Sequence, residues 1–356
     1  CTHLASERKQ VMKEYAAKDI AIDFTPGIET EDLIFLDTSK PPFSIHGLMY
    51  ENDAYCRIPD AVAEAVSPFV RTLSKYTAGG RLRFRLKNSP HFSVHALGEP
   101  KKEHWCISPL SAMEGIDVYV NGRFSRIDYP HKDEYLFTYY AYTGDDEIEI
   151  NLPLSRNISR IVIGVSPDAV VCEPRKYALE KPIVFYGSSI TQGMCASRPG
   201  MTYEAQLSRS LDFDYINLGF SGSAKAEDAI ADYIAGLDMS VFVYDYDHNA
   251  PTKEHLENTH YNMYEKIRAK NPDIPYIIVG KPDFFNAEWE RRAVIFETFS
   301  KAKAQGDKNV YYVDSSAMFG GITWDDCTVD GCHPTDLGFY KMYEAFLPTF
   351  KTILAK

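Results

Sequence analysis

The chain has 356 residues, enough for two domains of ordinary size, and 45% of them are hydrophobic and 13% aromatic, which is enough to form packed cores. The formal net charge is −12, with 38 Lys and Arg against 50 Asp and Glu. This excess of carboxylates argues against a nucleic-acid-binding surface, because phosphates are bound by clustered cations. No run approaches the roughly eighteen apolar residues of a membrane-spanning helix, so we expect a globular protein with a neutral or small ligand.

The sequence begins at Cys1 rather than at Met, so either the chain was trimmed or a signal segment precedes this numbering. Bacterial lipoproteins begin their mature chain with a lipidated cysteine, and the polar stretch after Cys1 resembles such a tether. We therefore expect an exported protein, periplasmic or at the cell surface, with a lipid anchor at Cys1 as one option. The seven cysteines lack paired CxxC spacing, which argues against a zinc site. Cys327 and Cys332 are close enough in sequence to bridge, but spacing does not decide it.

The first half of the chain, to about residue 172, consists of short alternating apolar and polar runs broken by turn residues. This pattern predicts antiparallel sheets. Asn121-Gly122 predicts a two-residue hairpin turn between alternating flanks. Residues 60–76 have a helical pattern, which Pro68 weakens. We expect an N-terminal tail over residues 1–20 and a β-sandwich of jelly-roll type over residues 21–174.

From residue 175 to residue 356 the pattern of apolar and polar residues is different. Continuous apolar runs such as IVFYG, VFVYDY and YIIVGK alternate with longer helical stretches. Such alternation predicts a three-layer, doubly wound α/β domain in which helices cover both faces of a parallel sheet. Ligands of such domains bind at the carboxyl ends of the strands, and the polar clusters of this half all fall at predicted strand ends.

Two adjacent serines follow the first of these strands. A strand that ends at Gly187 and turns directly into a helix places Ser188 and Ser189 at the helix N-terminus, where unpaired N–H groups and the helix dipole favour a developing negative charge. A nucleophile would be well sited there. A serine at such a junction on its own is more often a helix cap.

Further polar residues follow the next two strands. In NLGFSGSA, Gly219 and Gly222 permit a tight turn and a close approach of the backbone. In YDYDHNAP, Asn249 is either a hydrogen-bond donor of a site or the first residue of an Asx turn. Asp247 and His248 could bind a metal, but no second carboxylate–histidine group at ligand spacing supports a metal site.

The last cluster contains Asp330 and His333, which are three residues apart. We expect both at the start of a helix that runs to about residue 346, with Pro334 in its first turn. A carboxylate that holds an imidazole, a serine and preorganised N–H donors are the parts that nucleophilic acyl transfer requires.

The segments GSSITQG, NLGFSGSA, the Asn249 segment and DGCHP resemble, in this order, the four motif blocks of the SGNH or GDSL hydrolase superfamily, and they span residues 183 to about 346. The resemblance implies a catalytic triad of Ser189, His333 and Asp330. It implies an oxyanion hole formed by the N–H groups of Ser189 and Gly222 and the side chain of Asn249. We expect no cofactor and no metal.

Two positions depart from the family pattern. Ser188 stands where the family usually has Asp before the nucleophile, and Asp-His-Asn-Ala replaces the usual Gly-x-Asn-Asp block. The second departure makes the role of Asn249 the less secure one, because the shape of its loop does not follow from the sequence.

The upstream stretches FSIHGLMYENDAYCRIPD and SPLSAMEGIDVYVNGR are similar to the β-sandwich domain of a bacterial subgroup of this superfamily, many of whose members are regarded as carbohydrate or acetyl esterases. The segments 194–203 and 280–290 are mixed and aromatic rather than long and aliphatic, which favours a small acyl group. We expect a serine esterase that removes an acyl group, acetyl above all, from a carbohydrate or another small ester. The alternatives are a lipid or thioester hydrolase of the same superfamily and a non-catalytic glycan-binding protein. The sequence does not indicate the oligomeric state.

Overall fold

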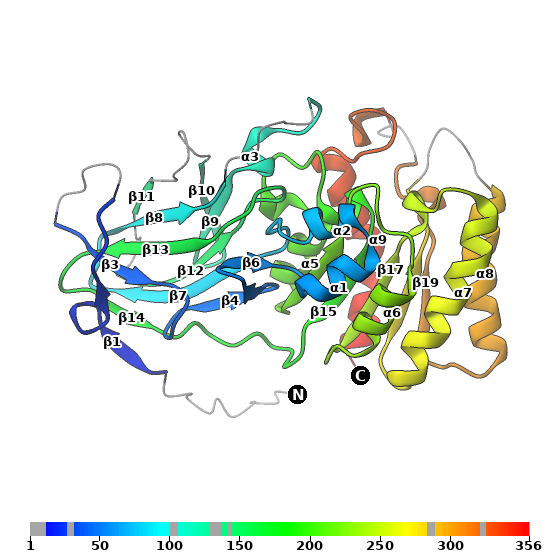
Figure 1. The fold of residues 1–356 in the computed structure, drawn as a ribbon, viewed down its shortest axis with the longest axis horizontal. Helices are drawn as coiled ribbons and strands as arrows, with labels where there is room; N and C mark the ends of the chain where they lie inside the picture. The colour runs from blue at the N-terminus through cyan, green and yellow to red at the C-terminus, as the bar shows by residue number, and fades with distance from the viewer. Residues whose placement is uncertain are drawn as a thin grey trace, which may run out of the picture.

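The computed structural model describes residues 12–26, 32–99, 106–128, 137–140, 144–282, 289–320 and 325–355. The β-rich part and the α/β part lie side by side along the longest axis of the molecule (Figure 1). Cys1 lies outside the described residues. Within the described ranges, every helix falls short of the combined length and hydropathy that a membrane span requires.

The N-terminal domain is a sandwich of two antiparallel sheets, as predicted. One sheet contains, in spatial order, β1 (Glu14–Ala16), β14 (Val170–Cys172), β7 (Arg81–Lys87), β12 (Asp145–Asn151), β9 (Ile116–Val120) and β10 (Arg123–Asp128), with β4 (Ser44–His46) paired to β7. The other contains β11 (Phe137–Tyr140), β8 (His91–Leu97), β13 (Arg160–Val165), β3 (Ile34–Asp37) and β2 (Ala21–Ile22). A separate hairpin consists of β5 (Met49–Glu51) and β6 (Ala54–Cys56).

Alternation along β7 shows why these segments form sheets. Leu82, Phe84 and Leu86 point into the core between the sheets, while the arginines between them face the other way, because successive side chains of a strand point to opposite faces. The predicted hairpin turn is confirmed: Asn121 and Gly122 both have positive φ angles, 52° and 74°, between β9 and β10.

The expected tail boundary at residue 20 is wrong for its described part. Glu14 to Ala16 form β1, which pairs with β14, and the next residue, Ala17, is buried and donates its N–H to Ala169 O at 2.9 Å. The sandwich therefore includes residues 14–20.

The single helical pattern over residues 60–76 is two helices, α1 (Asp60–Val66) and α2 (Pro68–Leu73). Ser67 between them is extended and its side chain accepts the N–H of Val70 at 3.1 Å, so it caps α2. Pro68 is then the first residue of α2, where it lacks no helical hydrogen bond. Both helices pack against the C-terminal domain, because Ala63 and Val70 share a core with Ile230.

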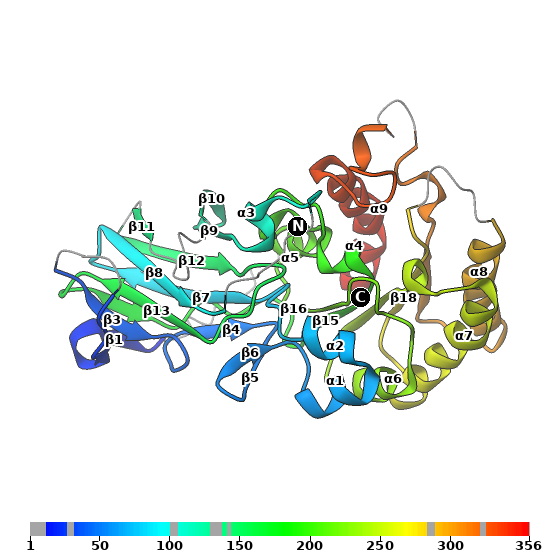
Figure 2. The same ribbon diagram turned by 45° about the horizontal axis from the view of Figure 1, so that its top comes forward.

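The C-terminal domain is built on a parallel five-stranded sheet among the described residues, with the order β16 (Tyr215–Gly219), β15 (Ile183–Gly187), β17 (Val241–Asp245), β18 (Tyr276–Val279) and β19 (Val310–Val313). The helices of this domain are α4 (Ser189–Gln192), α5 (Tyr203–Leu211), α6 (Asp228–Ala235), α7 (Lys253–Lys270), α8 (Trp289–Ala304) and α9 (Asp336–Leu354). Helices α6, α7 and α8 lie on one side of the sheet and α5 and α9 on the other (Figures 1 and 2).

Strand β15 shows how both faces are covered. Val184 and Tyr186 pack into the core that contains α6, α7 and α8, whereas Ile183 and Phe185 pack into the core that contains α5 and α9. The predicted doubly wound α/β domain is confirmed. Since β15 lies between β16 and β17, the residues after it occupy the point where the strand order reverses, which is where ligands of such sheets bind.

The predicted start of the last helix is wrong. Helix α9 begins at Asp336, with Thr335 as its cap, and continues past Pro348 to Leu354. Asp330 and His333 lie in the turn before it, so Pro334 precedes the helix rather than occupying its first turn. Asp330 binds the N–H groups of Cys332 and His333, which makes it the first residue of an Asx-type turn instead of a helical residue.

Candidate active site

Ser189 is the first residue after the turn that ends β15. Helix α4, which it begins, has a single turn: Ser188 caps it by accepting the N–H of Ile190 at 3.1 Å, and Gly193 ends it with a φ angle of 98°. Ser188 thus supplies an oxygen to the helix N-terminus, as the usual aspartate could. The helix is too short for the macrodipole that the sequence suggested, so local N–H groups must provide most of any field at Ser189.

The Ser189 hydroxyl meets an imidazole from the far end of the chain. Its Oγ atom lies 2.9 Å from His333 Nε2, and Ser189 and His333 each keep 8% of their surface exposed. The other ring nitrogen, Nδ1, lies 2.9 Å from Asp330 Oδ2. The structure therefore brings Ser189, His333 and Asp330 into one hydrogen-bonded chain.

Asp330 is held in its ionised form by this turn. Partial burial raises its pKa, but the hydrogen bonds from the backbone and side chain of His333 outweigh burial and leave the pKa below its ordinary value. Its Oδ1 atom accepts the N–H of His333 at 2.7 Å and that of Cys332 at 3.0 Å. A carboxylate fixed by two N–H groups keeps its other oxygen aimed at the imidazole, which favours a proton on Nδ1 and an unprotonated Nε2 facing Ser189.

The loop after β16 passes next to α4. A Cβ atom on Gly219 would lie 2.2 Å from Gln192 N, so only glycine allows this approach. Gly222 has a φ angle of 67°. The N–H groups of its neighbours Ser221 and Ser223 bind Gln192 Oε1 and Phe220 O, while within the described part of the chain the N–H of Gly222 has no acceptor. Gly222 is exposed, so this N–H is open to solvent and accessible to a ligand.

Asn249 reaches across to this loop. It lies in the short 3-10 turn Asp247–Asn249 after β17, and its Oδ1 atom accepts the N–H of Ala224 at 3.3 Å. This contact is not an Asx turn, because the acceptor binds a different segment. With Oδ1 engaged by the loop, the amide Nδ2 is left as a donor.

Sequence reasoning missed two side chains that shape the site. Gln192 is almost fully buried; its Oε1 atom binds Ser221 N at 3.0 Å and its Nε2 binds Leu154 O of the sandwich at 3.1 Å. Asn217 donates to Thr191 O at 2.5 Å and accepts the N–H of Gly219 at 2.9 Å. Both lie inside the motif segments. Asn217 interrupts the apolar run YINLGF, which was the available signal for it, whereas Gln192 stands among polar residues and had no such signal.

Asp247 and His248 have structural contacts that do not form a metal site. Asp247 Oδ1 accepts the N–H of Lys281 at 2.9 Å, and His248 Nδ1 lies 3.8 Å from Cys332 Sγ. Burial, together with the nearby charges of Lys281 and His333, lowers the pKa of His248 to about 3, so this imidazole is neutral at pH 7. Across the described ranges, no group of three or more His, Cys, Asp and Glu is placed to hold a metal ion.

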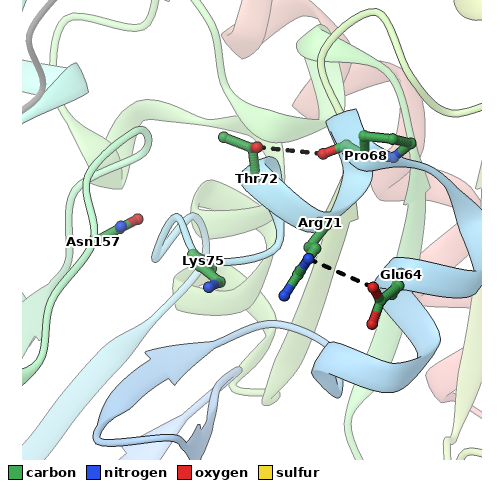
Figure 3. A pocket seen from close by; sticks show the side chains of 6 residues that line it. All are labelled: Glu64, Pro68, Arg71, Thr72, Lys75 and Asn157. Atoms are coloured by element: carbon green, nitrogen blue, oxygen red, sulfur yellow. Dashed lines mark hydrogen bonds and ion pairs between the residues drawn. The ribbon is translucent and has the colours of Figure 1, made fainter.

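A cavity of about 390 Å³ opens elsewhere, over α1 and α2 (Figure 3). Arg71 in its wall lies 3.6 Å from Glu64, and both side chains are largely exposed. Lys75 and Asn157 line its opposite side (Figure 3). Neither Ser189 nor His333 lines this cavity, so we do not assign it to the site.

A doubly wound α/β domain with a serine, an imidazole and a carboxylate in one hydrogen-bonded chain at the strand ends has the arrangement typical of serine hydrolases. Residues 180–351 match the GDSL-like lipase/acylhydrolase family, and residues 33–171 match the N-terminus of SGNH-hydrolase-type esterases, a model named for the motif GxDLY. The chain thus belongs to the SGNH/GDSL hydrolases, in the subgroup with an N-terminal β-sandwich, which confirms the predicted resemblance.

Solved structures share the whole two-domain fold. A protein from Bacteroides ovatus named as a GDSL-like lipase has a TM-score of 0.81 and 28% identity, over 91% of this chain and 98% of that one. A salicylyl-acyltransferase from a tetracycline biosynthetic pathway has a TM-score of 0.74 and 19% identity, over 89% and 96% of the two chains. A family two carbohydrate esterase from Clostridium thermocellum, solved with cellohexaose, has a TM-score of 0.58 and 14% identity, over 88% and 99%. No curated protein matches the chain.

Proposed function

We propose that the protein is a serine esterase that removes a small acyl group, acetyl above all, from a carbohydrate through an acyl-enzyme. The observation that carries the proposal is the 2.9 Å contact between Ser189 Oγ and His333 Nε2. A base at that distance can take the serine proton as the hydroxyl attacks the ester carbonyl.

In the first half of the reaction, Ser189 Oγ bonds to the carbonyl carbon while its proton moves to His333 Nε2. The carbonyl oxygen becomes an anion, which the N–H groups of Ser189 and Gly222 and the Nδ2 of Asn249 would stabilise. The tetrahedral adduct then breaks its bond to the sugar oxygen, and His333 gives that oxygen the proton. Asp330 orients the imidazole and stabilises its charged form during these steps.

In the second half, His333 Nε2 takes a proton from water, and the resulting hydroxide attacks the acyl-enzyme. The second adduct releases the carboxylic acid, and the proton returns to Ser189 Oγ. Two features of the protein support this sequence. The Asp330 carboxylate binds His333 Nδ1, and the N–H of Gly222, which has no acceptor among the described residues, lies on a loop fixed by Gln192 and Asn249.

The proposal of a small acyl group rests on the character of segment 194–203 and not on the Ser189–His333 contact. A long acyl chain would need a greasy lid or tunnel, but most of segment 194–203 is buried and it carries polar contacts to both domains, so it is not a lid of that kind. Part of the other candidate segment, residues 283–288, lies outside the described residues. The same fold occurs in a carbohydrate esterase and in an acyltransferase, so the fold alone does not choose the acyl group.

The experiment is a series of p-nitrophenyl esters from acetyl to dodecanoyl, together with acetate release from acetylated polysaccharides. Ser189→Ala is the blank, and Ser210→Ala is the matched control, because Ser210 lies on the surface of α5 and contacts Tyr343. We expect turnover that is highest with acetyl, unchanged in Ser210→Ala and lost in Ser189→Ala. Preference for long chains would instead assign a lipid hydrolase, and absence of any Ser189-dependent turnover would overturn the esterase.

A further inference from the structure

The sandwich contacts the segment that follows the helix of Ser189. Asp117, in the sequence Gly-Ile-Asp-Val-Tyr of β9, has no exposed surface. Its Oδ2 atom accepts a hydrogen bond from Arg198 Nη1 at 2.7 Å and from Gly200 N at 2.8 Å, and its Oδ1 accepts one from Asn151 Nδ2 at 2.8 Å. All three donors bind the same buried carboxylate. The interaction is therefore a buried, charge-assisted set of hydrogen bonds rather than a surface ion pair.

Gly200 packs closely against strand β9. A Cβ atom on Gly200 would lie 2.6 Å from Asp117 Oδ2 and 2.8 Å from Tyr119 OH, so the segment approaches the strand as near as a backbone can. The Tyr119 hydroxyl in turn accepts a hydrogen bond from Arg198 Nη1 at 2.6 Å. Asp117 thus binds both Arg198 and Gly200 of the catalytic domain, and Tyr119 of the same Gly-Ile-Asp-Val-Tyr sequence binds Arg198.

The same segment is bound on its other side to the element that carries the imidazole. Ser197 donates its N–H to Asp336 Oδ1 at 2.8 Å and its hydroxyl to Asp336 Oδ2 at 2.5 Å. Asp336 is the first residue of α9, three residues after His333. Ser111 of the sandwich donates to Ser197 O at 2.6 Å. A continuous set of contacts therefore runs from Asp117 through residues 197–200 to the start of α9.

We propose, on the basis of the function proposed above, that the sandwich acts as a clamp that positions the catalytic histidine, with Asp117 as a positioning residue. The clamp consists of Asp117, Arg198, Gly200, Ser197 and Asp336. Segment 194–202 starts directly after the helix of Ser189. Because the clamp fixes this segment against α9, the clamp sets the distance between Ser189 Oγ and His333 Nε2.

The turn that carries His333 is also held by its own local hydrogen bonds, so the clamp only adjusts the position of the imidazole. Val329 N binds His333 O at 2.8 Å and Thr335 N binds Cys327 O at 2.9 Å, which hold the turn locally. Loss of the clamp should therefore displace the imidazole slightly rather than remove it. A displacement of about 1 Å can lower the rate about 100-fold.

The test compares Asp117→Asn with Asp146→Asn. Asp146 is an equally buried carboxylate of the same sandwich, and it binds Asn121 and Gly144 near the β9–β10 hairpin. We expect kcat for p-nitrophenyl acetate to fall about 10- to 100-fold in Asp117→Asn, with KM within threefold, and to stay within twofold of wild type in Asp146→Asn.

A second readout does not depend on activity. The Nδ1 proton of His333, assigned by its absence in His333→Asn, should give a downfield NMR signal through its bond to Asp330. We expect this signal to shift or broaden in Asp117→Asn and to keep its position in Asp146→Asn. Ser197→Ala removes the hydroxyl bond to Asp336 at the partly exposed other end of the clamp and leaves the backbone N–H bond in place. It should change the signal in the same direction as Asp117→Asn and is the variant to use if Asp117→Asn does not fold.

The outcomes separate the two proposals. An unchanged kcat and an unchanged His333 signal in folded Asp117→Asn or Ser197→Ala would overturn the clamp and leave the esterase intact. Equal losses of kcat in Asp117→Asn and Asp146→Asn would also overturn it, because they would reflect general damage to the sandwich. A shifted signal in a protein that hydrolyses no ester would support the clamp and refute the esterase.

Discussion

His333 Nε2 lies 2.9 Å from Ser189 Oγ, although 144 positions of sequence separate the two residues. Strand β15 ends directly before the turn that leads to Ser189, and the turn before α9 carries His333 to the same edge of the parallel sheet. Each residue is fixed by its own local structure, Ser189 by the cap of α4 and His333 by the Asx-type turn of Asp330. The contact is thus formed between two preorganised segments.

The role of Asp330 is tested by Asp330→Asn. The asparagine can still accept the N–H groups of the turn through Oδ1, but its Nδ2 would face His333 Nδ1 as a donor and favour the wrong imidazole tautomer. We expect kcat to fall about 10²- to 10⁴-fold with little change in the melting temperature. Asp238→Asn, which removes a surface ion pair with Lys181, is the control. A loss of less than threefold would show that Asp330 is dispensable for the chemistry.

The role of Asn249 is tested by Asn249→Ala. If its amide binds the oxyanion, kcat should fall about 10²- to 10³-fold, and binding of a trifluoromethyl ketone, which forms an anionic adduct on the serine, should weaken in parallel. The matched control is Asn262→Ala, since Asn262 binds Asn258 O on the surface of α7. If ketone affinity were retained in Asn249→Ala, the side chain would act only in holding the loop at Ala224.

Gly219 is tested by Gly219→Ala. The added methyl would lie 2.2 Å from Gln192 N, so the loop or α4 must move. We expect a loss of about 1–3 kcal/mol in the free energy of unfolding, measured by urea denaturation. In Gly236→Ala the methyl would lie 3.5 Å from its nearest neighbour, and we expect a change within about 0.5 kcal/mol. Equal stabilities of the two variants would contradict the close approach.

The pH dependence of stability is tested at His260. This imidazole is fully buried on α7, binds Thr298 Oγ1 through Nδ1 at 2.8 Å and stacks on Tyr244. Burial lowers its pKa to about 3 from an ordinary value of 6.5. Between these two values the unfolded chain binds a proton that the folded protein excludes, so the free energy of unfolding falls as the pH decreases, by about 1.4 kcal/mol per pH unit for this group.

His260→Gln should therefore reduce the slope of unfolding free energy against pH between pH 6 and pH 4, measured by urea denaturation. His255→Gln on the same helix is the control, because His255 lies near the surface and binds Lys225 O. An unchanged slope in His260→Gln would mean that this imidazole is protonated in the folded protein.

The sequence predicted most of the architecture for physical reasons that operate locally. Continuous apolar runs such as residues 183–187 mark strands covered on both faces, and Asn121-Gly122 marks a tight hairpin. The boundaries were wrong where two local signals compete. Asp330 and Thr335 both resemble helix caps, and only the structure shows that the first closes a turn and the second caps α9.

Contacts between segments far apart in the sequence could not be predicted. Strand β1 has three residues, too few for a periodic pattern, and its place in the sheet depends on pairing with β14. The bond from Gln192 to Leu154 and those from Arg198 and Gly200 to Asp117 join segments about 40 to 80 residues apart. A single sequence contains no signal for such pairs, because side-chain polarity identifies a donor but not its acceptor.

The most direct measurement is the mass of the protein after reaction with a fluorophosphonate, followed by peptide mapping. We predict one adduct, on Ser189 and not on the adjacent Ser188, formed quickly in the wild type and at least about 100-fold more slowly in His333→Ala. An adduct on another residue, or labelling of Ser189 at the same rate without His333, would contradict the assignment of Ser189 and His333 as nucleophile and base.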